Sequence, residues 1–323
     1  MRFAVVGAGA TGGYLGARLA HAGFEVTLIA RGPHLVAMRE RGVKVLEPDG
    51  SELTARPACT DELEAIGAAE TIFVTLKAHS LPALAPRLGT APNPAATMVF
   101  AQNGIPWWLL QGRQPPLQLQ AVDPAGVISA SIPAASVAGA IVYPATSLVE
   151  PGVVRHVEGN RFSLAEPDGS RSERLRAISA ALSEAGLRAP LQARPWQEVW
   201  LKLIGNATLN PVTALTRATL AELLGDPGGR DLVRELMLEV EAVGRGLGVE
   251  PDISVDTRLQ GASRVGEHRT SMLQDVEAGR PLEVEALVGS VVELAALLGV
   301  PVPRLQVVYE LTRLLDRSVR RSW

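Results

Sequence analysis

The sequence has few of the residues that build disulfide bonds, metal sites or strongly charged surfaces. It contains one cysteine, Cys59, and five histidines in 323 residues, so we expect neither an internal disulfide nor a metal site. Its 31 basic and 34 acidic side chains leave a formal net charge of −3, which argues against nucleic acid as the main partner. No stretch reaches the ~18 uninterrupted apolar residues of a membrane span. These scarcities predict a cytoplasmic protein that binds neither membranes nor nucleic acids.

What the sequence does have is enough apolar residues, 47% of the chain, for two well-packed domains. Apolar runs alternate with helical segments in the first part, which predicts an α/β domain over 1–193, and helical periodicity then predicts an all-α domain over 194–323. The predicted strands are 3–6, 25–30, 71–76 and 97–101, with further strands in 137–166 that extend the same sheet. The predicted helices of the second domain are 198–216, 231–247, 271–278, 283–298 and 304–317.

Glycines follow the first apolar run. Gly7-x-Gly9-x-x-Gly12 comes directly after the predicted strand 3–6 and opens a helix. In a Rossmann-type domain, these glycines make the turn, let the backbone approach a dinucleotide pyrophosphate, and let the helix pack closely on the strand. The alternatives are a secretory signal, whose apolar core would have to be longer than four residues, and a glycine-rich turn that binds nothing. The expected cofactor-binding residues here are Gly7, Ala8, Gly9, Ala10, Thr11 and Gly12.

Polar residues follow three of the predicted strands. Arg31 comes after the strand 25–30, where an NAD site usually has a carboxylate, and its guanidinium suits the 2′-phosphate of NADPH. Lys77 and Asn103 follow the next two strands, at the carboxyl ends where α/β sheets bind ligands. An ordinary surface arginine and an Asn103-Gly104 turn without a ligand are the alternatives.

A line of polar residues runs along one predicted helix. Lys202, Asn206 and Asn210 are spaced at i, i+4 and i+8, so they spread over only ~80° of one helix face. Asparagine is a poor helix-interior residue. The pattern therefore indicates a face that lines a wet cleft, and a solvated surface stripe is the alternative.

Two further polar residues have structural explanations. Ser271-x-x-Gln274 fits a capping box, which explains Ser271 without a ligand. Glu283 and Glu285 fall in the first turn of a predicted helix, where the helix dipole favours acidic residues. Neither pattern by itself indicates a binding role.

Together these motifs resemble the ketopantoate reductases (2-dehydropantoate 2-reductases) over nearly the whole chain. The resemblance rests on the glycine motif, Leu76-Lys77-Ala78, Gln102-Asn103-Gly104, Lys202-x-x-x-Asn206-x-x-x-Asn210, Ser271-Met272-Leu273-Gln274-Asp275 and Gly279-Arg280-Pro281-Leu282-Glu283-Val284-Glu285. It implies a Rossmann-type NADPH domain, a helical domain, and an active site in the cleft between them. The implied reaction is reduction of a 2-oxo acid, with 2-dehydropantoate, an intermediate of pantothenate biosynthesis, as the leading candidate.

The resemblance also implies roles for the polar residues of the second domain. Lys202 would be the general acid that protonates the carbonyl oxygen, and Glu283 would hydrogen-bond a substrate hydroxyl. Asn206, Asn210 and Ser271 would bind the 2-oxo acid. The chemistry agrees, because hydride transfer puts negative charge on the carbonyl oxygen, which an ammonium both stabilises and protonates.

On the cofactor side, the resemblance places Asn103 between nicotinamide and substrate, and Lys77 and Arg31 next to the nucleotide. One segment departs from the family, because the chain after Gly104 is longer and carries Trp107-Trp108. These tryptophans would either reshape the substrate pocket, or pack under an extra loop or in a subunit contact. Another 2-oxo acid as substrate, a non-catalytic NADPH sensor and a homodimer are options that the sequence leaves open.

Overall fold

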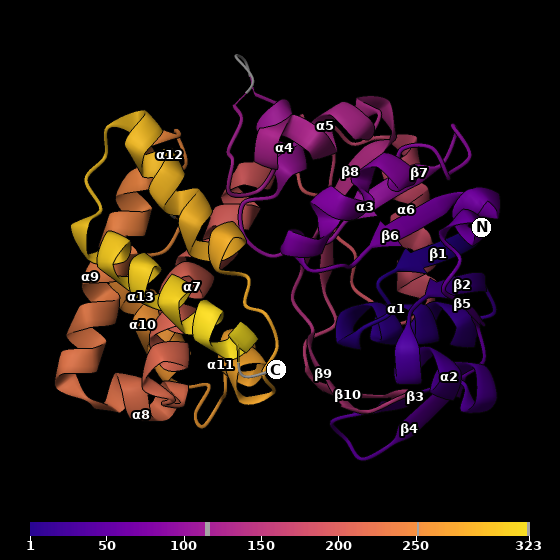
Figure 1. Ribbon diagram of the computed structural model, residues 1–323, viewed down its shortest axis with the longest axis horizontal. Helices are drawn as coiled ribbons and strands as arrows, with labels where there is room; N and C mark the ends of the chain where they lie inside the picture. Colours follow the sequence, from indigo (N-terminus) through magenta and orange to yellow (C-terminus); the bar gives the residue numbers. More distant parts are fainter. Residues whose placement is uncertain (114–116, 251, 322–323) are drawn as a thin grey trace. The chain divides into compact units, whose positions relative to one another are not determined.

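The computed structural model describes residues 1–113, 117–250 and 252–321, and the chain forms two compact units. We call them the N-terminal unit (Met1–Gln102, Pro106–Gln118 and Asp123–Pro195) and the helical unit (Asn103–Ile105, Leu119–Val122 and Trp196–Trp323). Within the described residues, the first unit combines sheets with helices and the second is built of helices (Figure 1). The predicted fold class, a Rossmann-type α/β domain plus an all-α domain, is confirmed.

A seven-stranded sheet in the order β11-β8-β7-β6-β1-β2-β5 forms the centre of the N-terminal unit. Its strands are β1 (Arg2–Val6), β2 (Glu25–Ile29), β5 (Ala58–Thr60), β6 (Thr71–Val74), β7 (Thr97–Phe100), β8 (Val137–Val142) and β11 (Phe162–Ala165). All neighbouring strands are parallel except β8 and β11. Val6 pairs with both Ile29 and Val74. The loops after β1, β2 and β6 therefore leave the sheet at the same edge.

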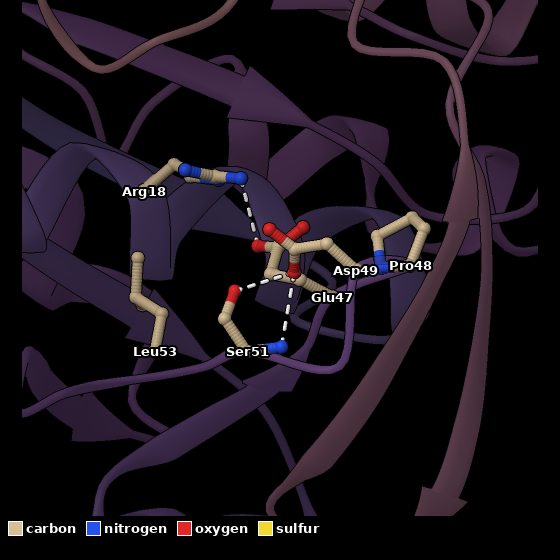
Figure 2. A pocket seen from close by; sticks show the side chains of 6 residues that line it. All are labelled: Arg18, Glu47, Pro48, Asp49, Ser51 and Leu53. Carbon is tan, nitrogen blue, oxygen red and sulfur yellow. Dashed lines mark hydrogen bonds and ion pairs between the residues drawn. The ribbon is translucent and has the colours of Figure 1, made fainter.

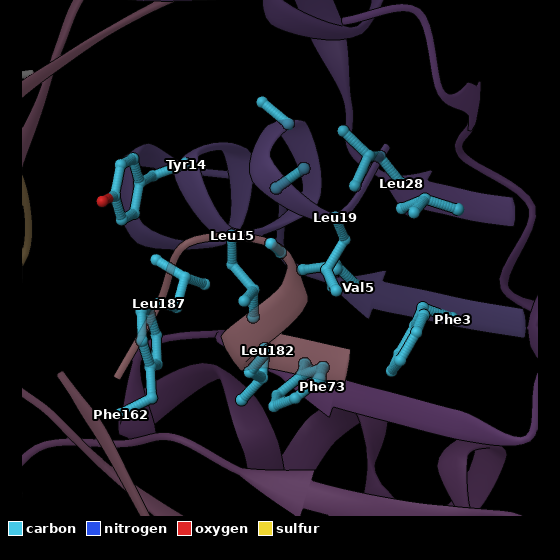
Figure 3. Packing of buried hydrophobic residues seen from close by; sticks show 14 of the residues in the cluster. Phe3, Val5, Tyr14, Leu15, Leu19, Leu28, Phe73, Phe162, Leu182 and Leu187 are labelled. Carbon is cyan, nitrogen blue, oxygen red and sulfur yellow. The ribbon is translucent and has the colours of Figure 1, made fainter. Parts of the chain in front are cut away.

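Helices cover this sheet and close its core. α1 (Ala10–His21) and α6 (Glu173–Glu184) contribute Leu15, Leu19 and Leu182 to a buried cluster that includes Val5 and Phe73 of the sheet (Figure 3). Burying a side chain of this size contributes about 1.5–3 kcal/mol. The other helical elements of the unit are α2 (Gly32–Arg41), η1 (Leu63–Ala68), η2 (Ala78–Ser80), α3 (Leu81–Leu88), α4 (Trp107–Gln111), η3 (Pro124–Gly126), α5 (Val127–Ser131) and η4 (Ala134–Ser136).

A second sheet, in the order β4-β3-β10-β9, also contacts α1. Its strands are β3 (Val43–Leu46), β4 (Glu52–Ala55), β9 (Ala145–Glu150) and β10 (Val153–Glu158). The prediction that every strand in 137–166 extends the first sheet is therefore wrong for β9 and β10. After β9 the chain reverses at Gly152, which has φ +85°. β10 then pairs antiparallel with β9 and parallel with β3. Local periodicity cannot reveal a partner more than 100 residues away.

The helical unit contains α7 (Pro195–Thr216), α8 (Leu220–Gly225), α9 (Pro227–Gly246), α10 (Val255–Ser263), α11 (Ser271–Glu277), the π-helical turn η5 (Glu285–Gly289), α12 (Ser290–Leu298) and α13 (Pro303–Arg321). α8 and α10 were not predicted, because they are short and their apolar pattern is weak. The capping box of Thr219 and Glu222 is the sequence signal that marks the start of α8. Of the helices in the described ranges, none is both long and apolar enough to cross a lipid bilayer.

Candidate active site

The glycine motif forms the loop between β1 and α1, and packing explains two of its glycines. Gly7 has φ +97°, and its N–H donates to the carbonyl of Ile29 at 3.1 Å. A Cβ on Gly12 would lie 2.5 Å from the carbonyl oxygen of Gly7, so only glycine lets α1 begin this close to the strand. The space at Gly9 is open, because the nearest atom to a Cβ there would be 4.0 Å away.

The N-terminus of α1 suits a phosphate. Gly9 is its N-cap, no side chain caps it, and its first turn holds no acidic residue. The N–H groups of Ala10, Thr11 and Gly12 have no acceptor within the helix, because they belong to its first turn. Together with the helix dipole, these donors favour a bound anion. The loop therefore fits the pyrophosphate of a dinucleotide.

Side chains at two neighbouring strand ends hold the glycine loop and the segment after β6. The hydroxyl of Thr75 donates to the carbonyl of Gly7 at 2.8 Å. The amide Nε2 of Gln102 donates to the carbonyl of Leu76 at 3.2 Å and to that of the last residue of β6 at 2.8 Å. These bonds fix the segment that leads into Lys77, which is partly buried. Thr75 was missed in the sequence, although its place at the end of a buried strand was a usable signal.

Arg31 and His34 lie at the start of α2, just after β2. Arg31 is exposed and directly precedes α2. His34 Nδ1 accepts the N–H of Gly152 at 2.9 Å, so its Nε2 carries the proton that is donated to the carbonyl of Ala8 at 2.7 Å. Burial lowers the pKa of His34, which keeps the ring neutral. His34 therefore ties the glycine loop to the turn between β9 and β10, a contact that the sequence could not show.

In the helical unit, Lys202 of α7 contacts Asn103. Lys202 Nζ donates to Asn103 Oδ1 at 2.7 Å, and the lysine side chain is partly buried. Desolvation lowers the pKa of Lys202 to about 8, and the negative charge of Glu283 opposes part of that shift. The side chain of Asn103 therefore has a defined partner, besides the place of the residue in the turn. Three predicted site residues from distant segments of the chain interact within one unit.

The polar line on α7 continues toward α11. Asn210 is 6% exposed, and its Nδ2 lies 3.5 Å from the hydroxyl oxygen of Ser271. Asn206 lies one turn before Asn210 and is partly buried. A solvated stripe would leave these side chains in water, so the burial of Asn210 contradicts that alternative.

The predicted capping box at Ser271 is wrong by one residue. The N-cap of α11 is Thr270, whose hydroxyl accepts the N–H of Leu273 at 3.3 Å. Thr213 of α7 shares a 2.7 Å hydrogen bond with the same hydroxyl. Serine and threonine are both good N-caps, so the sequence could not choose between these neighbours. Ser271 is instead the first helical residue, and its exposed side chain faces Asn210.

Trp107 and Trp108 pack inside the N-terminal unit. Trp107 lies edge-to-face against Phe100, with ring centroids 5.0 Å apart, and Trp108 fills the space that Gly139 leaves in β8. The two tryptophans are 3% and 1% exposed. Of the alternatives for this segment, packing agrees with the structure, and the packing partners are residues of the strands β7 and β8.

A surface pocket of about 460 Å³ lies elsewhere in the N-terminal unit (Figure 2). Its charged groups already have partners among the lining residues. Arg18 Nη2 contacts Glu47 Oε1 at 2.7 Å, and Asp49 Oδ1 accepts hydrogen bonds from the N–H and hydroxyl of Ser51. None of the predicted site residues lines this pocket. The candidate residues therefore form two groups, the glycine loop in the N-terminal unit and the residues around Lys202 in the helical unit.

Comparison with known proteins identifies the family. The model described as ketopantoate reductase PanE/ApbA matches residues 3–169, and the model of the C-terminal part of the same family matches residues 195–316. The chain belongs to the ketopantoate reductase PanE/ApbA family. It is therefore an oxidoreductase that works with a pyridine nucleotide, and the glycine loop described above is suited to the pyrophosphate of such a nucleotide.

Relatives of this reductase match it over nearly their whole length. A 2-dehydropantoate 2-reductase from Mesorhizobium japonicum is 46% identical over 323 residues, covering 98% of either chain. Another, from Halobacterium salinarum, is 30% identical over 320 residues, covering 98% of this reductase and 100% of the relative. The crystal structure of a PanE/ApbA family ketopantoate reductase from Ralstonia eutropha JMP134 has a TM-score of 0.86 and 26% identity, covering 99% of this chain and 100% of the other.

Proposed function

We propose that this reductase converts 2-dehydropantoate to pantoate with NADPH as the hydride donor. The relatives from Mesorhizobium japonicum and Halobacterium salinarum are named for that activity. The observation that carries the proposal is the pairing of Lys202 with Asn103 at 2.7 Å, together with a pKa of about 8 at the lysine. A partly buried ammonium with its proton held in a fixed direction is what carbonyl reduction requires.

Reduction of a 2-oxo acid needs a hydride at the carbonyl carbon and a proton at the carbonyl oxygen. When bound, the reduced nicotinamide supplies the hydride. Lys202 stabilises the negative charge that grows on the oxygen and then transfers a proton to it from Nζ. Because its pKa is about 8, the lysine is protonated at neutral pH and is a stronger acid than an exposed lysine.

Asn103 and Glu283 keep Lys202 ready for this step. Asn103 Oδ1 accepts one N–H of the ammonium and so limits the directions in which the other two can point. The charge of Glu283 raises the pKa of Lys202 against desolvation, so the amine keeps its proton until the substrate is reduced. Glu283 also accepts a hydrogen bond from the hydroxyl of 2-dehydropantoate, a group that simpler 2-oxo acids lack.

The remaining polar residues bind the two ligands. Asn206, Asn210 and Ser271 offer amide and hydroxyl donors to the carboxylate and carbonyl oxygens of the 2-oxo acid. On the cofactor side, the backbone of residues 7–12 binds the pyrophosphate, and Lys77 also contacts the nucleotide. Arg31 binds the 2′-phosphate, which is why we propose NADPH rather than NADH.

The proposal is tested at Lys202. With saturating NADPH and 2-dehydropantoate, Lys202→Ala is expected to lower kcat by roughly 10²–10⁴, while fluorescence titration shows that NADPH still binds. Lys202→Arg is the matched control, because arginine keeps the positive charge but does not release its proton. We expect it to stay nearly as slow as the alanine variant. Near-normal turnover in Lys202→Ala would refute the general-acid role.

A second experiment tests the substrate. NADPH oxidation is followed by absorbance with 2-dehydropantoate and with branched and aromatic 2-oxo acids that lack its hydroxyl. We expect the highest kcat/KM with 2-dehydropantoate, because a site built to bind a hydroxyl discriminates strongly against analogues without it. A higher kcat/KM with any of the other acids would reassign the substrate and leave the reaction type unchanged.

A further inference from the structure

A helix of the helical unit contains a π-helical turn two residues after Glu283. In this turn, η5, the N–H of Ser290 donates to the carbonyl of Glu285, five residues earlier, and bypasses Ala286, which is four residues earlier. The carbonyl of Ala286 therefore lacks the donor that an α-helix would give it. Ala286 is 3% exposed, so water does not readily replace that donor, and a buried carbonyl requires a partner.

Two other donors take that place. The hydroxyl of Ser290, a residue with no exposed surface, donates to the Ala286 carbonyl at 2.7 Å. The N–H of Ile105 donates to the same oxygen at 3.3 Å. Gly104, with φ +89°, makes this approach possible, because a Cβ there would lie 2.0 Å from that oxygen. The corner formed by Asn103, Gly104 and Ile105 is thus docked on the π-turn.

Side chains of α13 fix the π-turn itself. The hydroxyl of Tyr309 donates to Glu285 Oε2 at 2.6 Å, and Arg313 Nε lies 3.6 Å from Glu285 Oε1. Gly289 leaves room for this carboxylate, because a Cβ there would lie 2.5 Å from Glu285 Oε2. In the sequence, the helix dipole alone was enough to explain Glu285. In the structure, its carboxylate also connects the π-turn to α13.

We propose that the π-turn positions the proton donor of the reaction. The bypassed carbonyl of Ala286 docks the corner, and the docked corner presents Asn103 Oδ1 to Lys202. An ordinary α-turn would pair Ala286 with the N–H of Ser290 and release the corner, so the hydrogen bond from Lys202 to Asn103 would lose its fixed geometry. Ser290 and Gly104 are therefore positioning residues that act through Asn103. This inference rests on the proposed role of Lys202.

Two variants and two matched controls test it. Ser290→Ala removes the hydroxyl that occupies the Ala286 carbonyl, and Ser263→Ala removes the same kind of hydroxyl-to-carbonyl bond from the regular helix α10. Gly104→Ala pushes the corner off the π-turn, and Gly266→Ala adds a methyl group at a similar positive φ where no atom lies within 4 Å. Each variant is compared by kcat, by NADPH affinity, and by hydrogen exchange in peptides spanning residues 101–110.

We expect faster exchange at the corner in both test variants, with kcat lower by about tenfold for Ser290→Ala and ~10²-fold for Gly104→Ala. NADPH affinity and both controls should stay near the parent values. If Gly104→Ala does not fold, Ser290→Ala carries the test. Unchanged exchange, faster exchange with unchanged kcat, or a matching loss of NADPH affinity would each overturn the proposal. Hydrogen exchange reports the docking of the corner without any turnover, so it tests the positioning role independently of catalysis. The kcat of Lys202→Ala, measured in parallel, tests the general-acid role by itself.

Discussion

At the scale of single residues, Lys202 combines a proposed chemical role with an environment that disfavours its charge. Its ammonium is partly buried, is bound by Asn103, and lies within range of the charge of Glu283. The spacing with Asn206 and Asn210 located this helix face in the sequence. The partner Asn103 is 99 residues away, and only the fold brings the two side chains together. The motif therefore singled out Lys202 as a candidate, and the structure shows that Asn103 accepts a hydrogen bond from its ammonium.

The lowered pKa of Lys202 predicts how activity depends on pH. The general acid works in its protonated form, and this form is lost as the pH rises through about 8. We therefore expect kcat/KM for the 2-oxo acid to fall above that pH, measured at saturating NADPH. Lys202→Ala should lose this limb of the profile along with most of its turnover. A parent profile that stays flat well above pH 8 would contradict the assignment.

Arg31 carries the predicted choice of cofactor. Its guanidinium is exposed at the carboxyl edge of the sheet, beyond a strand that ends without a carboxylate. We expect Arg31→Ala to weaken NADPH binding by about tenfold or more, with little change for NADH, because only NADPH has the 2′-phosphate. Arg41→Ala, an exposed arginine at the end of α2, is the control. Equal losses for both nucleotides in Arg31→Ala would remove the basis for choosing NADPH.

At the scale of secondary-structure elements, the cap of α11 connects stability with the site. Thr270 caps this helix and shares a hydrogen bond with Thr213 of α7. Ser271, the next residue, thereby lies beside Asn210. The threonine pair thus fixes the position of two predicted substrate-binding residues, although neither threonine was singled out in the sequence.

Replacing this cap should affect both folding and substrate binding. We expect Thr270→Ala to lower the free energy of unfolding by about 1 kcal/mol and to raise the KM for the 2-oxo acid several-fold, while NADPH affinity is kept. Ser254→Ala, which removes the cap of α10, is the control. It should lower stability by a similar amount and leave KM unchanged. If both variants gave the same KM, the cap of α11 would have only a structural role.

Elements with strong local signals were predicted well, and those defined by distant partners were not. The strand, glycine turn and helix at the N-terminus could be read because buried apolar residues and conformationally special glycines are adjacent in the sequence. β9 and β10 could not be placed, since their alternation fits either sheet and the pairing with β3 decides. The π-turn was missed because its apolar pattern is also that of an ordinary helix, and the deviation depends on contacts with Ile105 and Tyr309.

At the scale of the whole molecule, the buried charge of Lys202 should reduce stability. Its pKa falls from 10.5 to about 8 on folding, so the folded state disfavours the charged form. We expect Lys202→Met to lose most of its turnover, as Lys202→Ala does, and to raise Tm by about 2–4 °C. Between pH 8 and 10.5 the unfolded chain binds more protons than the folded one, so the stability of the parent rises across that window relative to the variant. A variant that melts lower than the parent at neutral pH would contradict this.

The fold class could be read from the sequence because the change from alternating to helical periodicity extends over more than a hundred residues. The assignment of short segments of the first half of the chain to the helical unit could not be read from the sequence. Residues 103–105 and 119–122 belong to the helical unit. In the second of these segments, the N–H groups of Gln120 and Ala121 donate to the carboxylate of Glu293 at 2.7 and 2.9 Å. Contacts of this kind depend on single carboxylate and carbonyl groups. The periodicity of apolar residues in the sequence carries no information about them.

This crossing of the chain has a consequence for protein engineering. A fragment that starts at residue 194 would contain Lys202 but lack Asn103, its hydrogen-bond acceptor. Chimeras that exchange the helical halves of two relatives to alter substrate preference would therefore need to graft the two short segments as well. A single crossover at the apparent boundary would leave one parent's lysine facing the other parent's asparagine corner.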